Sequence, residues 1–308
     1  MDKRPHMPVL LQEVIESLQI KENGVYVDGT FGAGGYTQAI LDANPTTCVI
    51  AIDRDKTAID AGQALVEKYA PRLTLLQGCF GDMDSLVQQE VDGVVLDIGV
   101  SSMQIDQPER GFSFQKDGPL DMRMGQTGQT AADVVNTMDE QQLADVIYQY
   151  GEERFSRKIA KAIVSRRKEK KFETTLDLVQ TIHSVMPHKP GDIDSATRTF
   201  QALRIFVNDE LGQLEKGLTA AESILKDKGV LSVVTFHSLE DRIVKTFFQK
   251  ASAPSCHTNK YKKTEQKNYR FQLQTKKPVS ATNEEVKINP RSRSAHLRSA
   301  IRNKEIVQ

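Results

Sequence analysis

The sequence predicts an α/β fold, in which a parallel sheet is covered by helices and interrupted by an all-helical insertion. Three observations lead to this prediction. Strand and helix patterns alternate between residues 25 and 97, a glycine-rich turn follows the first strand, and a helical stretch follows the fourth strand. Alternation at this spacing is typical of parallel strands joined by crossover helices.

Hydrophobic periodicity places the elements of the first part of the chain. Apolar residues at helical spacing predict a leading helix over 8–20, and short runs rich in Val, Ile and Leu predict buried strands. The expected order after that helix is strand 25–28, helix 36–43, strand 48–52, helix 55–69, strand 73–77 and strand 91–99.

The alternation stops after the fourth strand. Residues 106–126 are rich in Gly, Pro, Asp and Arg, which predicts a long functional loop, and residues 130–185 have a helical pattern throughout. Strand character returns at 229–236 and again at 295–302. The polar and basic residues 253–290 predict a flexible loop, or a loop that a partner orders.

These patterns divide the chain into two predicted domains. Residues 1–106 and 207–308 together form the sheet domain, which is discontinuous in sequence. Residues 107–206, which include a long helix beginning near Ala196, form an inserted helical domain. We expect the inserted domain to recognise the substrate.

Composition excludes several classes of protein. Hydrophobic residues make up 39% and charged residues 27% of the chain, as in ordinary soluble domains. No apolar stretch approaches the roughly 18 residues of a membrane span, and the amino terminus lacks the apolar core of a signal peptide. Because Cys48, Cys79 and Cys256 form no C-x-x-C pair, we expect no metal site, no disulfide and a cytoplasmic location.

Charge is distributed unevenly along this chain of 308 residues, whose formal net charge is zero. Residues 1–125 contain 10 Lys and Arg against 19 Asp and Glu, whereas residues 245–308 contain 15 against 4. Nine further bases lie within Arg154–Lys171. Such basic segments fit a polyanionic partner, although solvated helix surfaces would give the same pattern.

The glycine-rich turn after the first strand is the strongest local signal of function. Asp28 ends the strand, and four glycines fall within the next seven residues. Glycine is required where the backbone takes a positive φ or comes into contact with a ligand. A strand, a glycine turn and a helix together predict a ligand at the carboxyl end of the strand, although a tight turn without a ligand remains an alternative.

The spacing of the glycines distinguishes between nucleotide cofactors. A dinucleotide fingerprint G-x-G-x-x-G that started at Gly32 and Gly34 would need a third glycine where Thr37 stands. Asp28 would face a diphosphate unfavourably, but it suits a ligand with a cationic amino-acid end, such as S-adenosylmethionine. Asp53 ends the second strand and is placed to accept hydrogen bonds from ribose hydroxyls in either class. The glycine pattern therefore favours the methyl donor.

Several segments match one known family, in the expected order and over nearly the whole chain. They are His6-Met-Pro-Val-Leu-Leu, Asp28-Gly-Thr-Phe-Gly-Ala-Gly-Gly, Ala51-Ile-Asp-Arg-Asp, Leu96-Asp-Ile-Gly-Val-Ser-Ser, Glu109-Arg-Gly-Phe-Ser-Phe, Asp117-Gly-Pro-Leu-Asp-Met-Arg-Met, Thr199-Phe-Gln-Ala-Leu-Arg-Ile, Phe236-His-Ser-Leu-Glu-Asp-Arg and Asn289-Pro-Arg-Ser-Arg-Ser-Ala. With these segments the chain resembles the MraW/RsmH family of bacterial 16S ribosomal RNA (cytosine-N4)-methyltransferases.

The resemblance implies a Rossmann-like class I methyltransferase sheet with an inserted all-helical domain. It implies methylation of the N4 amine of a cytidine in 16S rRNA of the small ribosomal subunit, in its decoding region. The sequence departs from the family pattern at Tyr36, where histidine is common, and at Met103, where proline is common. The resemblance implies that the donor contacts Gly34, Gly35, Tyr36, Asp53, Phe80, Asp97 and Gln104.

The sequence offers two candidate catalytic groups, Asp97 and His237. Asp97, at the tip of the fourth strand, would bind the donor, orient the target amine, or do both, and the sequence leaves these alternatives open. His237 follows the fifth strand and is a candidate base, although a lone histidine is more often structural. Proton loss directly to water is a further alternative.

The basic segments are interpreted as RNA contacts beside such a core. A cytidine amine inside a helix is paired, so the base must be single-stranded or flipped out. The other functions considered are methylation of DNA or protein and non-catalytic RNA or nucleotide binding. A homodimer is compatible with the sequence. The candidate RNA-binding residues are Arg166, Arg167, Lys168, Lys262, Lys263, Arg291 and Arg293.

Overall fold

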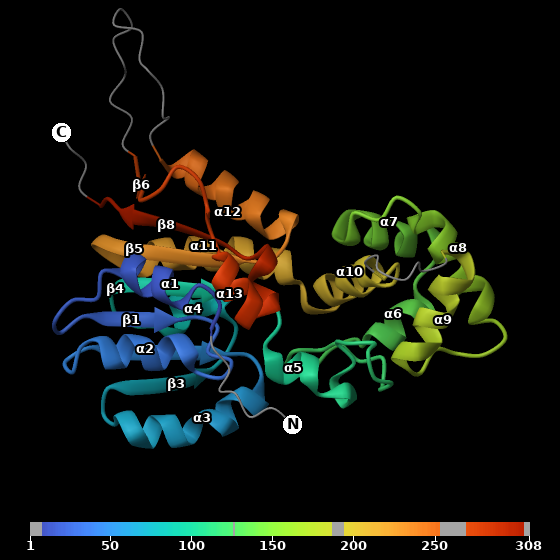
Figure 1. The fold of residues 1–308 in the computed structure, drawn as a ribbon, viewed down its shortest axis with the longest axis horizontal. Coiled ribbons are helices and arrows are strands. Elements are labelled where there is room, and N and C mark those ends of the chain that lie inside the picture. The colour runs from blue at the N-terminus through green and yellow to red at the C-terminus, as the bar shows by residue number, and fades with distance from the viewer. Residues whose placement is uncertain (1–7, 126, 187–193, 253–268, 305–308) are drawn as a thin grey trace, which may run out of the picture. The chain divides into compact units, whose positions relative to one another are not determined.

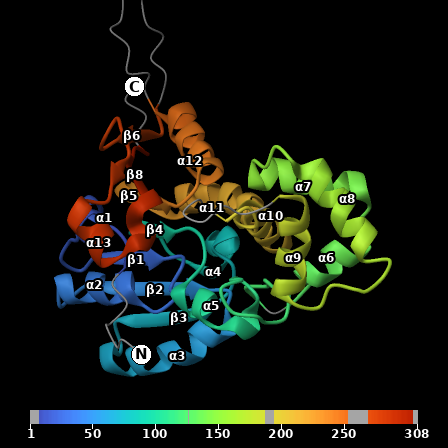
Figure 2. The ribbon, with the colours of Figure 1, turned by 45° about the vertical axis from the view of Figure 1, so that its right-hand side comes forward.

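The chain folds into two compact units (Figures 1 and 2). The computed structural model describes residues 8–125, 127–186, 194–252 and 269–304. The sheet unit comprises Met1–Gly99 and Leu211–Gln308, and the helical unit comprises Val100–Glu210.

The sheet unit is built on eight strands, seven of them in the order β3-β2-β1-β4-β5-β8-β6, while β7 pairs with β8. The strands from β3 to β5 are parallel, and β8 runs antiparallel to β5. This order confirms the predicted Rossmann-like sheet. The strands are β1 (Val25–Asp28), β2 (Cys48–Asp53), β3 (Leu73–Gln77), β4 (Val91–Asp97), β5 (Leu225–Thr235), β6 (Phe271–Leu273), β7 (Val279–Ser280) and β8 (His296–Arg302).

Helices cover both faces of this sheet, as its strands, buried on both sides, require. Residues of α1, α2 and α3 pack into one apolar core, and residues of α4, α11 and α12 pack into another. Each helix brings its apolar stripe to the sheet. The helices of this unit are α1 (Leu11–Leu18), α2 (Gly35–Ala43), α3 (Lys56–Tyr69), α4 (Met83–Leu86), α11 (Glu210–Ile224), α12 (Ser238–Ala251) and α13 (Asn283–Ile288), with the 3-10 helices η1 (Phe80–Asp82) and η3 (Pro290–Ser294).

Strand register brings three acidic residues to one edge of the sheet. Asp28 of β1 pairs with Ala51 of β2, next to Asp53, and Asp97 of β4 pairs with Val234 near the end of β5. Because parallel strands end at the same edge, the carboxyl ends of β1, β2 and β4 meet there. This carboxyl edge is where an open α/β sheet binds its ligands.

The helical unit interrupts the sheet between β4 and β5, and it has its own apolar core. Side-chain caps explain several helix starts. The hydroxyl of Thr130 accepts from the backbone N–H of Asp133, and Asp139 accepts from Gln142. Its helices are α5 (Ser102–Asp106), η2 (Pro108–Arg110), α6 (Ala131–Thr137), α7 (Glu140–Gly151), α8 (Ser156–Arg166), α9 (Thr175–Val185) and α10 (Thr197–Asn208).

One prediction about the chain's later part was wrong. The described portion of the expected flexible loop 253–290 contains β6, β7 and α13, and residues 253–268 lie outside the described residues. Phe271 carries the strand signal there, since it is buried against Phe248 at a ring-centroid distance of 5.7 Å. The polar residues around this short strand concealed its two apolar residues, Phe271 and Leu273, both of which pack into the core. None of the helices described is long and apolar enough to span a membrane.

Candidate active site

The glycine turn after β1 is fixed between the two strands that flank it. The N–H of Gly29 donates to Val95 O, and the N–H of Phe31 donates to Ile52 O. The hydroxyl of Thr30 accepts from the backbone N–H of Asp97 at 2.7 Å. Sequence reasoning did not single out Thr30. The feature that could have identified Thr30 is its position as a polar residue among the glycines of the turn.

The space around this turn explains why two of its residues are glycine. Gly34 has a φ of +78°, and a Cβ atom there would lie 2.9 Å from side-chain carbons of Phe31 and Leu65. A Cβ atom on Gly35 would lie 2.2 Å from Cγ of Pro8. The first position requires glycine for its backbone conformation and its neighbours, and the second for the close approach of Pro8.

Asp28 organises the turn from beneath it. Its carboxylate is fully buried and accepts from the N–H of Thr30 at 3.1 Å and from the hydroxyl of Thr37 at 2.7 Å. Burial raises the pKa of Asp28 to about 6, against the hydrogen bonds from Thr37 and Thr30, which lower it. Thr37, which distinguished the turn from a dinucleotide fingerprint, therefore has a bonding role that glycine would lack.

Asp97 stands next to Asp28 with one oxygen buried and available. Within the described part of the chain, its Oδ1 atom has no hydrogen-bond partner. Burial raises the pKa of Asp97 well above its ordinary value, and the nearby carboxylates of Asp28 and Glu240 raise it further. A buried acceptor without a partner is costly, so its presence at the carboxyl edge indicates a ligand-binding position.

Asp53 connects the end of β2 to the glycine turn. Its Oδ2 atom accepts from the N–H of Gly32 at 2.7 Å, and its Oδ1 atom accepts from the N–H of Asp55 at 2.8 Å. A carboxylate offers about four lone-pair positions, so each oxygen retains acceptor capacity. Asp55 fills the role of helix cap, since its side chain accepts from Thr57 N at the start of α3.

Two predicted donor contacts pack against protein neighbours, Tyr36 completely and Phe80 in part. The hydroxyl of Tyr36 donates to Val9 O, and its ring is buried in the core beside α1, so only its backbone remains for a ligand. Phe80 is half-buried at the start of η1. Its ring lies so close to Gly217 of α11 that a Cβ atom there would stand 2.4 Å from the ring.

Gln104 and His237 lie in different units. Gln104 belongs to the helical unit, where it forms a capping box with Ser101 at the start of α5. His237, in the sheet unit, caps α12. Its Nδ1 atom accepts from the N–H of Glu240, and its Nε2 atom lies 2.8 Å from Oε1 of Glu240. Both ring nitrogens face Glu240, but only Nδ1 takes part in the cap, since Nε2 forms no hydrogen bond with any residue described.

Glu240 is a buried residue of this edge that sequence reasoning missed. Its carboxylate accepts from the backbone N–H groups of Phe236 and His237 at 2.7 and 3.2 Å. A glutamate three residues after a capping residue is the signature of a capping box, and that spacing could have identified it. Glu240 therefore fixes the turn that follows β5.

The candidate RNA-binding residues at and just after the end of α8 have different environments. Arg167 donates to the carbonyls of Val135 and Met138, so it holds α6 to α8. Arg166 lies 3.6 Å from Asp177, and its guanidinium stands over the ring of Phe172. The side chain of Lys168 is exposed.

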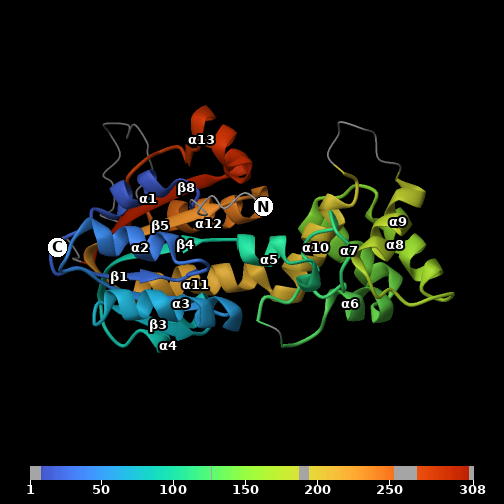
Figure 3. The same ribbon diagram turned by 60° about the horizontal axis from the view of Figure 1, so that its bottom comes forward.

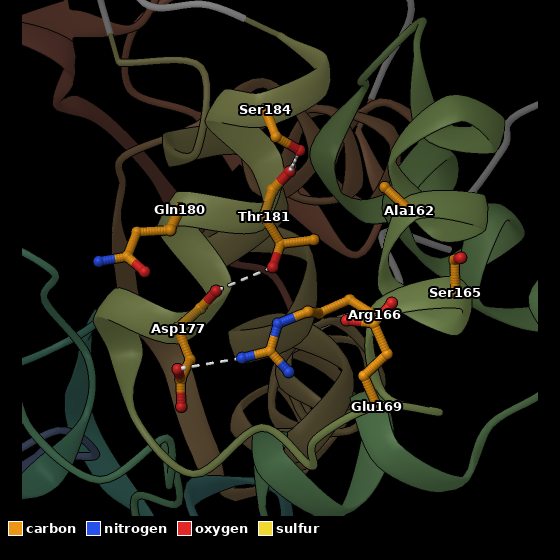
Figure 4. Close-up of a pocket in the computed structure, with 8 residues that line it drawn as sticks. All are labelled: Ala162, Ser165, Arg166, Glu169, Asp177, Gln180, Thr181 and Ser184. Carbon is orange, nitrogen blue, oxygen red and sulfur yellow. Dashed lines mark hydrogen bonds and ion pairs between the residues drawn. The ribbon is translucent and has the colours of Figure 1, made fainter.

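A polar pocket of about 400 Å³ lies between α8 and α9 (Figure 4). Arg166 crosses it toward Asp177, and the hydroxyl of Thr181 donates to the backbone carbonyl of Asp177. Its polar groups largely bind one another. The pocket is lined by Ala162, Ser165, Arg166, Glu169, Asp177, Gln180, Thr181 and Ser184.

The remaining candidate RNA-binding residues lie in the last part of the chain. Arg291 and Arg293 are exposed on η3. Lys262 and Lys263 lie outside the described residues.

Comparison with known proteins places the chain in one family. The model of the MraW methylase family matches residues 3–303. A protein of Paramagnetospirillum magneticum named ribosomal RNA small subunit methyltransferase H is 54% identical, over 98% of this chain and 97% of its own length. The protein of the same name from Bradyrhizobium diazoefficiens is 55% identical, over 98% and 93%.

Solved structures resemble the chain more distantly. A putative rRNA methylase from Clostridium thermocellum has a TM-score of 0.46 and 12% identity, over 98% of this chain and 100% of its own. An rRNA methylase from Streptococcus thermophilus has a TM-score of 0.43 and 11% identity, over 99% of each chain.

Proposed function

The chain belongs to the MraW methylase family, and we propose that it is an S-adenosylmethionine-dependent methyltransferase of small-subunit ribosomal RNA. The specific reaction proposed is methylation of the exocyclic N4 amine of a cytidine in 16S rRNA. The observation that carries the proposal is the buried, available Oδ1 atom of Asp97, which lies beside the glycine turn at the carboxyl edge.

The residues of this edge fit the chemistry of the proposed donor. The first backbone N–H groups of α2, at Gly35 and Tyr36, suit the carboxylate of its methionine end. Asp53 suits its ribose hydroxyls, and Phe80 offers a ring for its adenine. The buried acids Asp28 and Asp97 suit its positive charges, and a nearby cation in turn favours their ionised forms.

Transfer to a cytosine amine needs positioning more than activation. S-adenosylmethionine, when bound, supplies a methyl group on a sulfonium. The target amine is a weak nucleophile because its lone pair is delocalised into the ring. An acceptor at its N–H groups, for which Asp97 Oδ1 is placed, would turn the nitrogen toward tetrahedral geometry, and alignment contributes the remainder. His237 is the weaker catalytic candidate because its Nδ1 atom caps α12 and its Nε2 atom faces the buried carboxylate of Glu240.

Substrate recognition is assigned to the inserted helical unit and to the basic segments. The target base must be single-stranded or flipped, which costs a few kcal/mol that contacts to the surrounding RNA must supply. Exposed Lys168, just after α8, and Arg293 on η3 support such contacts. We further propose action in the cytoplasm on RNA within the small subunit, and a homodimer as the form to test.

The decisive experiment supplies radiolabelled S-adenosylmethionine with three acceptors: small ribosomal subunits from cells that lack the enzyme, DNA, and protein. Label in the subunit RNA that digests to N4-methylcytidine is the expected result. Label found only in DNA or only in protein would show that the proposed RNA substrate is wrong. Absence of donor binding in calorimetry would overturn the enzymatic function.

A further inference from the structure

We propose that α13 and η3 form a platform that binds the single-stranded RNA backbone next to the target cytidine. The platform consists of Lys287, Ile288, Arg291 and Arg293. The inference rests on the proposed function and deepens it, because it assigns part of the RNA-binding surface to the sheet unit. Figure 3 shows α13 projecting from the sheet above α1 and β8.

The platform lies at the carboxyl edge, where the donor site is. η3 leads directly into β8, whose first residue, His296, pairs with Thr235 at the end of β5. Thr235 stands two residues before His237. The chain therefore presents the platform where β5 ends, beside Asp97 at the end of β4.

A series of direct contacts connects the platform to the glycine turn. The carboxylate of Glu285 on α13 accepts from the backbone N–H of Leu10 at 2.8 Å. The residues before Leu10 lie against the turn, because Val9 O accepts from the hydroxyl of Tyr36 and Pro8 contacts Gly35. RNA held on the platform would consequently be held at a fixed place relative to the donor.

The backbone of the platform is held in shape by local bonds. The side chain of Asn289 accepts from the N–H of Arg291, and the hydroxyl of Ser292 donates to Asn289 O. Pro290 begins η3, and Ser292 is fully buried. A fixed turn that carries exposed cations loses little conformational entropy when it binds a phosphate backbone.

The exposed groups of the platform suit RNA. Lys287 and Arg293 form no ion pair or hydrogen bond through their side chains with any residue described, and both are exposed. The exposed acidic residue of α13 is Glu284, and the exposed cations of the platform outnumber it. Ile288, between them in sequence, is 61% exposed. A single exposed isoleucine is ordinary, but beside cations it offers an apolar contact to an unstacked base.

The test compares three double variants. Lys287→Glu with Arg293→Glu reverses the platform's charge. Lys287→Arg with Arg293→Lys preserves it. Lys245→Glu with Lys250→Glu makes the same net change at exposed lysines of α12. The probes are a 20-nucleotide single-stranded RNA and unmethylated small subunits, with donor affinity measured by calorimetry.

We expect the platform reversal to weaken RNA binding about tenfold, and to flatten the slope of log affinity against log salt by about 1.4, since each lost single-strand phosphate contact contributes about 0.7. Donor affinity should be unchanged in all variants. Equal losses in the reversed platform and the α12 variant would overturn the proposal. A loss confined to subunits, with RNA binding intact, would overturn it in favour of a protein partner. Failure of the wild-type protein to methylate subunits would instead overturn the proposed function.

Discussion

The glycine turn of the sheet unit and the surface of α8 in the helical unit are built in opposite ways. In the turn, Asp28 is fully buried, and the side chains of Asp28, Thr30 and Asp53 each accept a hydrogen bond from a backbone N–H group. At the C-terminal end of α8, Arg166 and Arg167 bind their own unit, while Lys168 is exposed. A small-molecule site depends on exact fit, whereas contact with a phosphate backbone depends on exposed charge.

Removing the carboxylate of Asp53 should give the largest effect. Asp53→Ala removes the acceptor for Gly32 N–H and the two proposed ribose bonds, and bonds to a charged acceptor contribute about 1.5–3 kcal/mol each. Donor affinity measured by calorimetry should fall at least 100-fold. Asp60→Ala, which removes an exposed α3 carboxylate paired with Lys56, should leave it unchanged. Equal donor affinities in the two variants would exclude Asp53 from the site.

Two glycines with similar φ angles allow the cost of steric overlap to be measured apart from the cost of backbone strain. Gly34 (φ +78°) and Gly128 (φ +85°) both adopt the left-handed region, but nothing lies within 4 Å of a Cβ atom on Gly128. Gly128→Ala should cost about 1–2 kcal/mol of unfolding free energy from backbone strain alone. Gly34→Ala should cost a further 1–3 kcal/mol from overlap with Phe31 and Leu65. Urea unfolding measures both, and equal losses would contradict the close packing of the turn.

Asp28 should make stability depend on pH. Because its folded pKa of about 6 exceeds the ordinary 3.8, the folded state binds more protons than the unfolded state between these values. Stability from this group is therefore full below pH 4 and falls as pH rises through 6, by about 3 kcal/mol. Asp28→Asn should lack this fall. Unfolding curves from pH 4 to 7.5 measure the difference, and parallel profiles would contradict the raised pKa.

The smallest effect on folding should come from exposed lysines near the end of α8. Lys168→Glu with Lys171→Glu should weaken RNA binding about tenfold, flatten its salt dependence by about 1.4 in slope, and spare donor binding and stability. Arg167→Met is the contrasting variant. It leaves the carbonyls of Val135 and Met138 without their donor and should cost about 1–3 kcal/mol of unfolding free energy. If the lysine variant lost stability and Arg167→Met lost only RNA binding, the assignment of the lysines to RNA and of Arg167 to folding would be wrong.

Local patterns made much of the sheet unit predictable. The strands 25–28 and 73–77 agree with the structure, because each is a short apolar run bounded by turn residues. The strand expected over 91–99 begins as predicted and ends two residues earlier, at Asp97. β5 starts at Leu225, earlier than the predicted 229, and its pairing with β4 shifts register between Val91 and Gly93. Hydrophobic periodicity does not reveal a register shift of that kind. β6 was missed for a related reason, since its burial comes from Phe248 of α12 rather than from its own pattern.

The sequence by itself determined the parallel sheet, the helical insertion, the glycine turn and the acids that end β1, β2 and β4. These follow from periodicity and residue type, which act over a few neighbours. Only the tertiary structure decided that the Tyr36 hydroxyl donates to Val9, that Arg167 binds α6, and that a buried oxygen of Asp97 has no hydrogen-bond partner among the residues described. Those outcomes depend on which distant atoms arrive beside a side chain, and no local pattern specifies them.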